Sequence, residues 1–155
     1  MNILVLEDDV EVGSMYKTVF EDYKYFKCTI CDNIIDFDYY LYSSKEKFDY
    51  YIIDLALESP DISPAVLKKW CDEQEIEPKT KINNRIPLIG WDYFIQKIVI
   101  NDKTKNILKN FILISGFKDA LEKQVQRDEF NKAENIFAKS NDDLSNNIIS
   151  IIKEK

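Results

Sequence analysis

The stretch ILVLEDD, residues 3–9, decides the fold, because four consecutive apolar residues stop abruptly at three acids. A short continuous apolar run is typical of a strand that is buried on both faces, as in the centre of a parallel sheet. The stretch FDYYIID at 48–54 repeats the pattern and ends at Asp54, and FILIS at 111–115 ends at Ser115. The sequence therefore predicts parallel strands with polar side chains at their carboxyl ends.

Apolar residues at helical spacing separate these strands. After the acids they predict a helix from about Val10 to Tyr23. Further helices are predicted over 34–41, 90–100, 118–129 and 144–152, and two more strands over 26–31 and 135–138. Strands that alternate with helices are typical of an α/β fold, in which helices cover both faces of a parallel sheet.

The segment at about 58–86 interrupts this alternation. All four prolines lie between positions 60 and 87, and Ser63-Pro64 is typical of a helix start, followed here by a short helix over 65–74. We therefore predict a single domain, 1–155, with an inserted segment at about 58–86. We also expect a stand-alone domain without an attached output domain.

Composition excludes several classes of protein. The net charge of −7 argues against a general nucleic-acid binder, which needs basic residues to neutralise phosphates. Histidine is absent, which removes histidine-based catalysis and histidine-ligated zinc. No apolar run reaches the roughly 20 residues that a membrane helix needs. Because the amino terminus also lacks a basic signal region, we expect a cytoplasmic protein without membrane contact.

Three cysteines indicate no disulfide framework. Cys28 and Cys31 form a C-x-x-C pattern, but on a strand the two side chains point to opposite faces of the sheet. We therefore interpret them as buried structural cysteines rather than as a metal or redox pair.

Polar residues at the strand ends predict one shared site. In an open α/β sheet the carboxyl ends of the strands meet at one crevice. Five residues occupy such ends: Glu7, Asp8, Asp54, Ser115 and Lys139. Mg²⁺ prefers hard oxygen ligands such as carboxylates and backbone carbonyls. The backbone carbonyl of Ala56, two residues after Asp54, lies within plausible reach of this site. Taken singly each signal is weak, since acids after a strand often serve only a helix amino terminus.

In these stretches the chain resembles the response-regulator receiver family of two-component signalling. Residues 3–9 are similar to the family's first strand and acid pair, and 48–54 to its third strand and phosphoacceptor. Residues 90–94 resemble the start of its third helix, 111–116 its fourth strand and switch hydroxyl, and 136–139 its fifth strand and lysine. The resemblance implies a flavodoxin-like (βα)5 three-layer sandwich with strand order 2-1-3-4-5.

The resemblance also implies a function. Asp54 would accept a phosphoryl group from a sensor histidine kinase or a phosphotransfer protein, with Mg²⁺ held near Glu7, Asp8 and Asp54. Ser115 and Lys139 would contact the phosphoryl oxygens. Such a domain assists its own phosphorylation and dephosphorylation without being an enzyme in the usual sense. Its output would be binding to a downstream protein, and homodimer formation stays open.

Three departures from the family pattern keep alternatives open. Ser140 stands where the family has proline, Ile136 stands where it has a switch aromatic, and the loop after Asp54 is about 30 residues longer. The first alternative is a degenerate receiver that acts as a phosphorylation-independent interaction module. The second is a phosphohydrolase or phosphotransferase with a nucleophilic aspartate. Ala56 opposes this alternative, because such enzymes commonly carry a second acid at that position.

Overall fold

A computed structural model describes residues 1–57, 89–116, 136–138 and 144–154. Five parallel strands form one sheet in the order β2-β1-β3-β4-β5, which agrees with the predicted order. The strands are β1 Asn2–Leu6, β2 Lys27–Cys31, β3 Tyr50–Asp54, β4 Phe111–Ser115 and β5 Ile136–Ala138. Every residue of β3 and β4 is buried, which is why these runs are continuously apolar up to their last residue.

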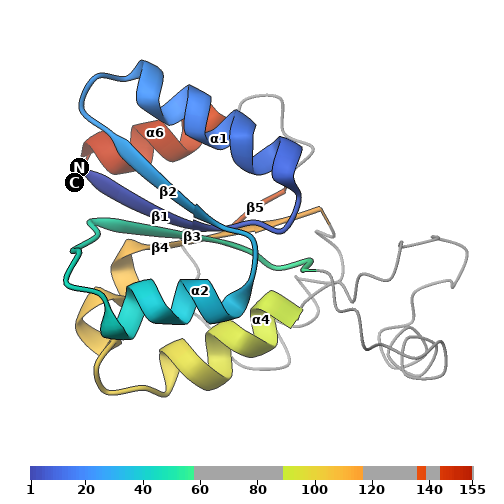
Figure 1. The fold of residues 1–155 in the computed structure, drawn as a ribbon, viewed down its shortest axis with the longest axis vertical. Helices are drawn as coiled ribbons and strands as arrows, with labels where there is room; N and C mark the ends of the chain where they lie inside the picture. Colours follow the sequence, from blue (N-terminus) through green and yellow to red (C-terminus); the bar gives the residue numbers. More distant parts are fainter. Residues whose placement is uncertain (58–88, 117–135, 139–143, 155) are drawn as a thin grey trace, which may run out of the picture.

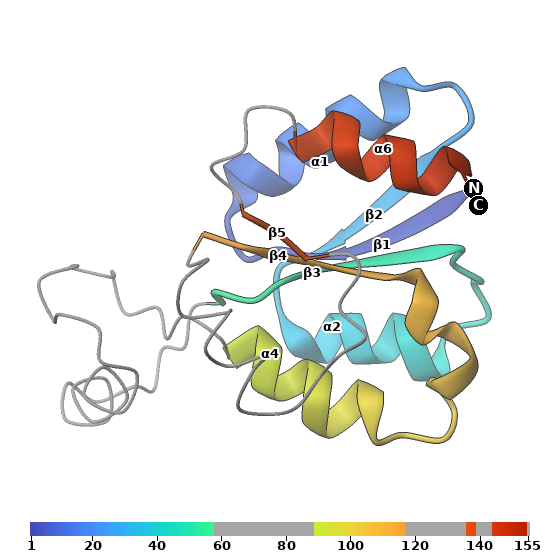
Figure 2. The same cartoon turned by 180° about the vertical axis from the view of Figure 1, so that it is seen from behind.

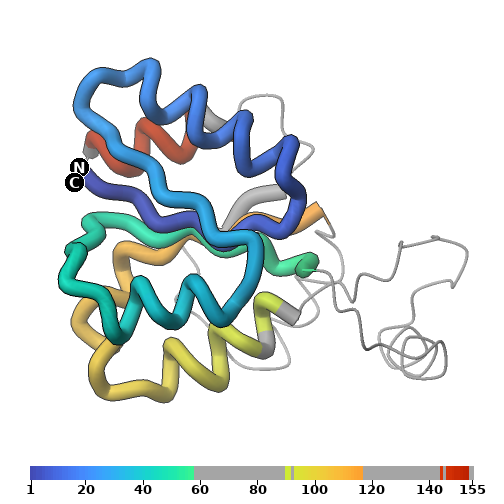
Figure 3. The backbone as a smooth tube through the Cα atoms, viewed as in Figure 1, coloured from blue at the N-terminus to red at the C-terminus, as the bar shows by residue number. Residues whose placement is uncertain are grey.

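The helices cover both faces of the sheet, as predicted (Figure 1). They are α1 Val10–Asp22, α2 Ile34–Asp38, α4 Ile89–Tyr93 and α6 Leu144–Glu154. Two of them continue in π-helical segments, α2 into η1 Tyr39–Ser43 and α4 into η2 Phe94–Val99. Helices α1 and α6 lie on one face, and α2 and α4 on the other (Figure 2). The backbone trace changes face between α1 and α2, so the sheet is doubly wound (Figure 3).

Two hydrophobic clusters, one on each face of the sheet, form the core. We call them the α1–α6 core and the α2–α4 core. The α1–α6 core includes Ile3, Val5, Tyr16, Phe20, Phe26, Cys28, Tyr50, Ile52, Ile112, Ile114, Leu144, Ile148, Ile149 and Ile152. The α2–α4 core includes Leu4, Leu6, Cys31, Phe37, Tyr51, Ile53, Leu55, Leu57, Trp91, Tyr93, Phe94, Ile98, Phe111 and Leu113. The two cysteines of β2 fall in different clusters and both are buried, as the strand periodicity predicts.

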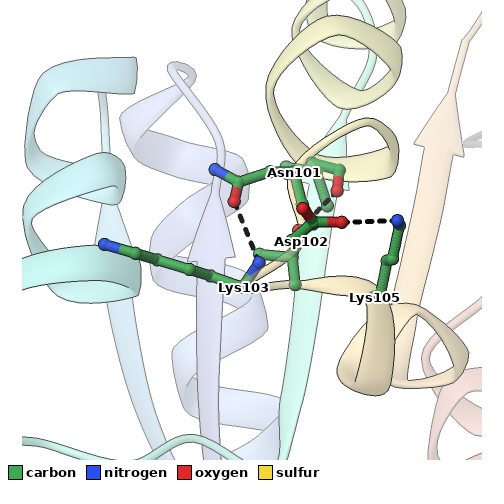
Figure 4. A network of polar contacts seen from close by, with 6 residues as sticks. Asn101, Asp102, Lys103 and Lys105 are labelled. Carbon is green, nitrogen blue, oxygen red and sulfur yellow. Dashed lines mark hydrogen bonds and ion pairs between the residues drawn. The ribbon is translucent and has the colours of Figure 1, made fainter.

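A polar turn at 101–105, which the sequence analysis did not predict, leads into the 3-10 helix η3, Lys105–Asn110. The backbone N–H of Lys103 donates to Oδ1 of Asn101 at 3.0 Å, and Lys105 forms an ion pair with Asp102 (Figure 4). The hydroxyl of Thr104 donates to the carbonyl of Asn101 at 2.9 Å. Side chains that bond to nearby backbone in this way favour turns over longer helices.

Several predictions fall outside the residues that the structure describes. These are the inserted segment at about 58–86 with its helix over 65–74, the helix over 118–129, and Lys139 with Ser140. Among the described helices, none combines the length and the apolar character that crossing a membrane requires.

Candidate functional site

Three carboxylates converge at the carboxyl ends of β1 and β3. Glu7 and Asp8 follow β1, and Asp54 is the last residue of β3, which is paired with β1 in parallel register. One ligand oxygen from each residue lies within 4.8 Å of the other two. Glu7 and Asp54 are each only 1% exposed. The structure therefore brings together the three acids that the sequence analysis assigned to one site.

The third acid of the first run has a different role. Asp9 is the N-cap of α1, and its Oδ1 accepts from the backbone N–H groups of Glu11 at 3.0 Å and Val12 at 3.2 Å. This bond pattern satisfies amide groups that the first turn of a helix leaves without intrahelical partners. The helix-terminus interpretation thus holds for Asp9, while Glu7 and Asp8 belong to the carboxylate cluster.

Backbone groups fix two of the clustered carboxylates. The N–H of Ala56 donates to Oδ1 of Asp54 at 3.0 Å, and the N–H of Asp9 donates to Oε1 of Glu7 at 3.2 Å. The N–H of Leu55 donates to the carbonyl of Ile114 at 2.8 Å, so the chain beyond Asp54 stays tied to β4. These bonds orient the acids before any ligand arrives, which lowers the cost of binding one.

The first turn of α4 presses against the peptide that carries Asp54. A Cβ built on Gly90 would lie 2.2 Å from the carbonyl oxygen of Asp54 and 2.7 Å from Cα of Leu55. The N–H of Gly90 also donates to the carbonyl of Leu55 at 3.1 Å. Only glycine permits this approach. The sequence analysis placed Gly90 at a helix start but missed this contact, and a glycine opening a helix beside a predicted site was the available signal.

Helix α1 covers the cluster from the other face. A Cβ on Gly13 would lie 3.9 Å from Cγ of Glu7, so the helix backbone passes close to that side chain. Tyr16, one turn further on, is 1% exposed. Burial raises the pKa of Tyr16, and the negative charges of Glu7 and Asp54 raise it further. Tyr16 therefore keeps its proton beside the acids, a neighbour that sequence reasoning did not identify.

The donor set of this cluster fits a divalent cation. Three carboxylates held this close repel one another, and a hard cation relieves that repulsion. Carboxylate oxygens with room for water are the ligands that Mg²⁺ takes in proteins. Glu7, Asp8 and Asp54 could hold such an ion, whereas the predicted role of the Ala56 carbonyl stays a prediction.

The remaining predicted residues are only partly placed. Ser115 is fully buried at the end of β4, one residue after Ile114, which is the register partner of Asp54. Ser115 is also paired in register with Ala138, the last residue of β5. Lys139 follows Ala138 and lies outside the described residues. The backbone of Ile136 is paired with that of Leu113, so the position predicted for a switch aromatic lies inside β5.

Comparison with solved structures supports the fold. The receiver domain of the Francisella response regulator 1452 is similar with a TM-score of 0.52 and 17% identity, over 99% of this chain and 97% of that one. A sensor protein from Polaromonas sp. JS666 is similar with a TM-score of 0.56 and 13% identity, over 98% of this chain and 93% of that one.

A third similar structure carries a different name. An adenylate cyclase from Rhodopirellula baltica has a TM-score of 0.51 and 15% identity, over 99% of this chain and 87% of that one. No protein-family model matches the sequence, and no curated protein matches it. At these identities the likeness concerns the fold alone. The parallel sheet, its helices and these neighbours together show that the chain has the α/β fold of a response-regulator receiver domain.

Proposed function

We propose that this chain is a phosphoacceptor receiver domain of two-component signalling, phosphorylated on Asp54. The observation that carries the proposal is the convergence of Glu7, Asp8 and Asp54 at the carboxyl ends of the central strands. The receiver fold adds support, because ligands of open α/β sheets bind at this edge. Mg²⁺ would be held by the three carboxylates and the carbonyl of Ala56.

The proposed reaction is a phosphoryl transfer to Asp54. A carboxylate oxygen attacks the phosphorus of a phosphohistidine or a small acyl phosphate. A new oxygen–phosphorus bond forms while the bond from phosphorus to the donor breaks, and the leaving group takes that electron pair. Bound Mg²⁺ would supply positive charge against which anionic donor and anionic carboxylate can approach. Water later attacks the phosphorus and restores the carboxylate.

The chain's own residues prepare Asp54 for this role. The N–H of Ala56 holds one carboxylate oxygen in place, and the close contact of Gly90 fixes the backbone below it. Ser115 and Lys139 would donate to the phosphoryl oxygens of the product. The domain would assist its own modification without turning over an outside substrate.

The partners follow from this chemistry. A histidine kinase or phosphotransfer protein would supply the phosphoryl group in the cytoplasm, and a downstream protein would bind the phosphorylated form. Nucleic acid is a poor candidate partner for a chain of net charge −7. Homodimer formation is a further possible output.

Intact mass after incubation with acetyl phosphate and Mg²⁺ tests the proposal. We expect one phosphoryl adduct that requires Mg²⁺ and is absent from Asp54→Asn. The adjacent acids offer a matched pair of controls. Asp8→Asn should lose the adduct because it removes a carboxylate of the cluster. Asp9→Asn should keep it, because asparagine caps a helix as well as aspartate does.

The outcome separates the proposal from its main alternative. Mg²⁺ binding is followed by Trp91 fluorescence in a Trp70→Phe background, which leaves Trp91 as the sole tryptophan. A chain with neither an adduct nor Mg²⁺ binding would be a degenerate receiver that acts independently of phosphorylation. Turnover of a small phosphate ester would instead point to a phosphohydrolase.

A further inference from the structure

Helix α4 is in direct contact with the backbone of the phosphoacceptor. Gly90 approaches the Asp54 carbonyl so closely that a methyl group would lie 2.2 Å from it, and its N–H donates to Leu55 at 3.1 Å. Trp91, the next residue, is fully buried, and its ring lies 6.1 Å from that of Phe94. Close-packed interiors transmit displacement rather than absorb it. A shift of the peptide after Asp54 therefore has to move α4.

Two tyrosine hydroxyls link α4–η2 to the neighbouring α2–η1 segment. The hydroxyl of Tyr93, on α4, donates to Oδ1 of Asp38, the last residue of α2. The hydroxyl of Tyr42, on η1, donates to the carbonyl of Lys97, on η2, at 2.7 Å. One bond starts from each segment and ends on the other, so the two segments are tied at two points.

Aromatic packing strengthens the first of these links. The ring of Tyr93 meets that of Phe37 edge-on, with centroids 6.1 Å apart and an interplanar angle of 83°. Tyr93 is 7% exposed and Phe37 is fully buried. Burial raises the pKa of Tyr93, and the bond to Asp38 raises it further, so the hydroxyl keeps the proton that it donates. Hydrogen bonds to a charged acceptor are the stronger kind.

The outer side of α2–η1 presents apolar side chains to solvent. Ile35 is 80% exposed, and Tyr39, four residues later on the same side of the helical segment, is 58% exposed. A movement of α4 that displaces α2–η1 would therefore also move these exposed side chains.

We infer that a change at Asp54 is transmitted through α4 to α2–η1 by the hydroxyl links of Tyr93 and Tyr42. This inference rests on the proposed function, because filling Asp54 is what starts the change. The connection is a contiguous physical one: a backbone contact at Gly90, the buried Trp91 and Tyr93, and two directed hydrogen bonds. It places a state-dependent surface at Ile35 and Tyr39.

Hydrogen exchange of the full chain tests the inference, with Mg²⁺ and beryllofluoride as the phosphoryl mimic. In the wild type, exchange in 34–43 and in 89–99 should both respond to the mimic. In Tyr42→Phe/Tyr93→Phe the response of 89–99 should remain, because the Gly90 contact is intact, while that of 34–43 is lost. Basal exchange of 34–43 should also be roughly thirtyfold faster, because two hydrogen bonds are lost and each contributes about fivefold.

Controls make each outcome decisive. Tyr39→Phe removes an exposed hydroxyl from the same segment and should respond like the wild type, and each single variant should lose part of the response. A wild type that binds the mimic but shows no change in 34–43 overturns the inference, as does a double variant with the full response. If Trp91 fluorescence shows no Asp54-dependent binding of the mimic, the proposed function fails, and the inference fails with it.

Discussion

The two faces of the sheet are built from different side chains. Among the described residues, seven of the fourteen members of the α1–α6 core are isoleucines, against two of fourteen in the α2–α4 core. The α2–α4 core instead has six aromatic residues, against four on the other face. Branched aliphatic residues have few rotamers and no polar atoms, so they pack as a fixed layer. Aromatic residues with hydroxyls pack equally well and also form directed bonds.

The comparison assigns different roles to the faces. The links from Tyr93 to Asp38 and from Tyr42 to Lys97 both lie on the α2–α4 side, where α4 also touches the backbone of Asp54. Directed bonds break or re-form in discrete steps, whereas an isoleucine layer has no equivalent alternative. Under the proposed transmission, the α2–α4 face would carry the response to the carboxylate cluster, and the α1–α6 face would hold the sheet in place.

The largest expected effect is on the reactivity of the two cysteines, one of which lies in the core on each face of the sheet. Burial raises the pKa of Cys28 and that of Cys31 from 9.0 to about 12. Only the thiolate reacts with alkylating reagents, so both thiols should react roughly a thousandfold more slowly in the folded chain near pH 8. Alkylation rates in a Cys71→Ser background, measured with and without denaturant, check this.

The same thiols sharpen the comparison between the faces. Mg²⁺ with beryllofluoride should change the alkylation rate of Cys31, which lies in the α2–α4 core, and leave that of Cys28 unchanged. Equal changes at both would mean that the faces respond together. Because the unfolded thiols ionise near 9 and the folded ones near 12, the free energy of unfolding should fall as pH rises through this window.

Gly90→Ala should have the largest effect on stability. Its Cβ would lie 2.2 Å from a backbone carbonyl that cannot rotate away, so α4 or β3 must shift. We expect a loss of about 3 kcal/mol in the free energy of unfolding, measured with urea, together with weaker Mg²⁺ binding. Gly116→Ala is the control, since a Cβ there meets no atom within 4 Å and should cost less than about 0.5 kcal/mol.

Much of the fold could be predicted because its strands are continuously apolar and stop at polar residues. The runs that end at Asp54 and Ser115 gave strands within two residues of their observed bounds. Because β1 and β3 are parallel, their carboxyl ends bring Glu7, Asp8 and Asp54 to one edge of the sheet, which the topology alone dictates. Asp9 could not be separated from its neighbours by sequence, because a capping aspartate and a clustered one look alike in a run of acids.

What the sequence could not provide are contacts across elements. The bond from Tyr93 to Asp38 joins residues 55 positions apart, and no periodicity relates them. The π-helical continuations of α2 and α4 were also beyond prediction, because apolar spacing over 34–41 and 90–100 fits an ordinary helix. The polar turn before η3 has a local signal in the polar run from Asn101 to Thr104. The spacing of apolar residues does not reveal it.

A matched pair of smaller changes compares the faces directly. Ile148 on α6 and Ile98 on η2 are both fully buried. Replacing either with valine removes one buried methylene and should cost about 1 kcal/mol by urea unfolding. Only Ile98→Val should alter the response of 34–43 to the phosphoryl mimic, since Ile98 follows the residue whose carbonyl accepts from Tyr42. An equal loss of response in Ile148→Val would contradict the division of roles.

The smallest effect is expected at the surface of the same α2–α4 side. Lys105 and Asp102 form an ion pair, but their side chains are 58% and 86% exposed. The hydrogen bond from Lys105 and its charge lower the pKa of Asp102, so any stability from the pair exists above pH 3.8 and is lost on acidification.

Lys105→Gln should nevertheless unfold like the wild type at neutral pH, because water and salt screen exposed pairs. Urea unfolding at low and high salt measures this. A loss as large as that of Ile98→Val would show that the turn at 101–105 anchors η2, and the response of this face would then depend on a surface pair as well as on its two tyrosine links.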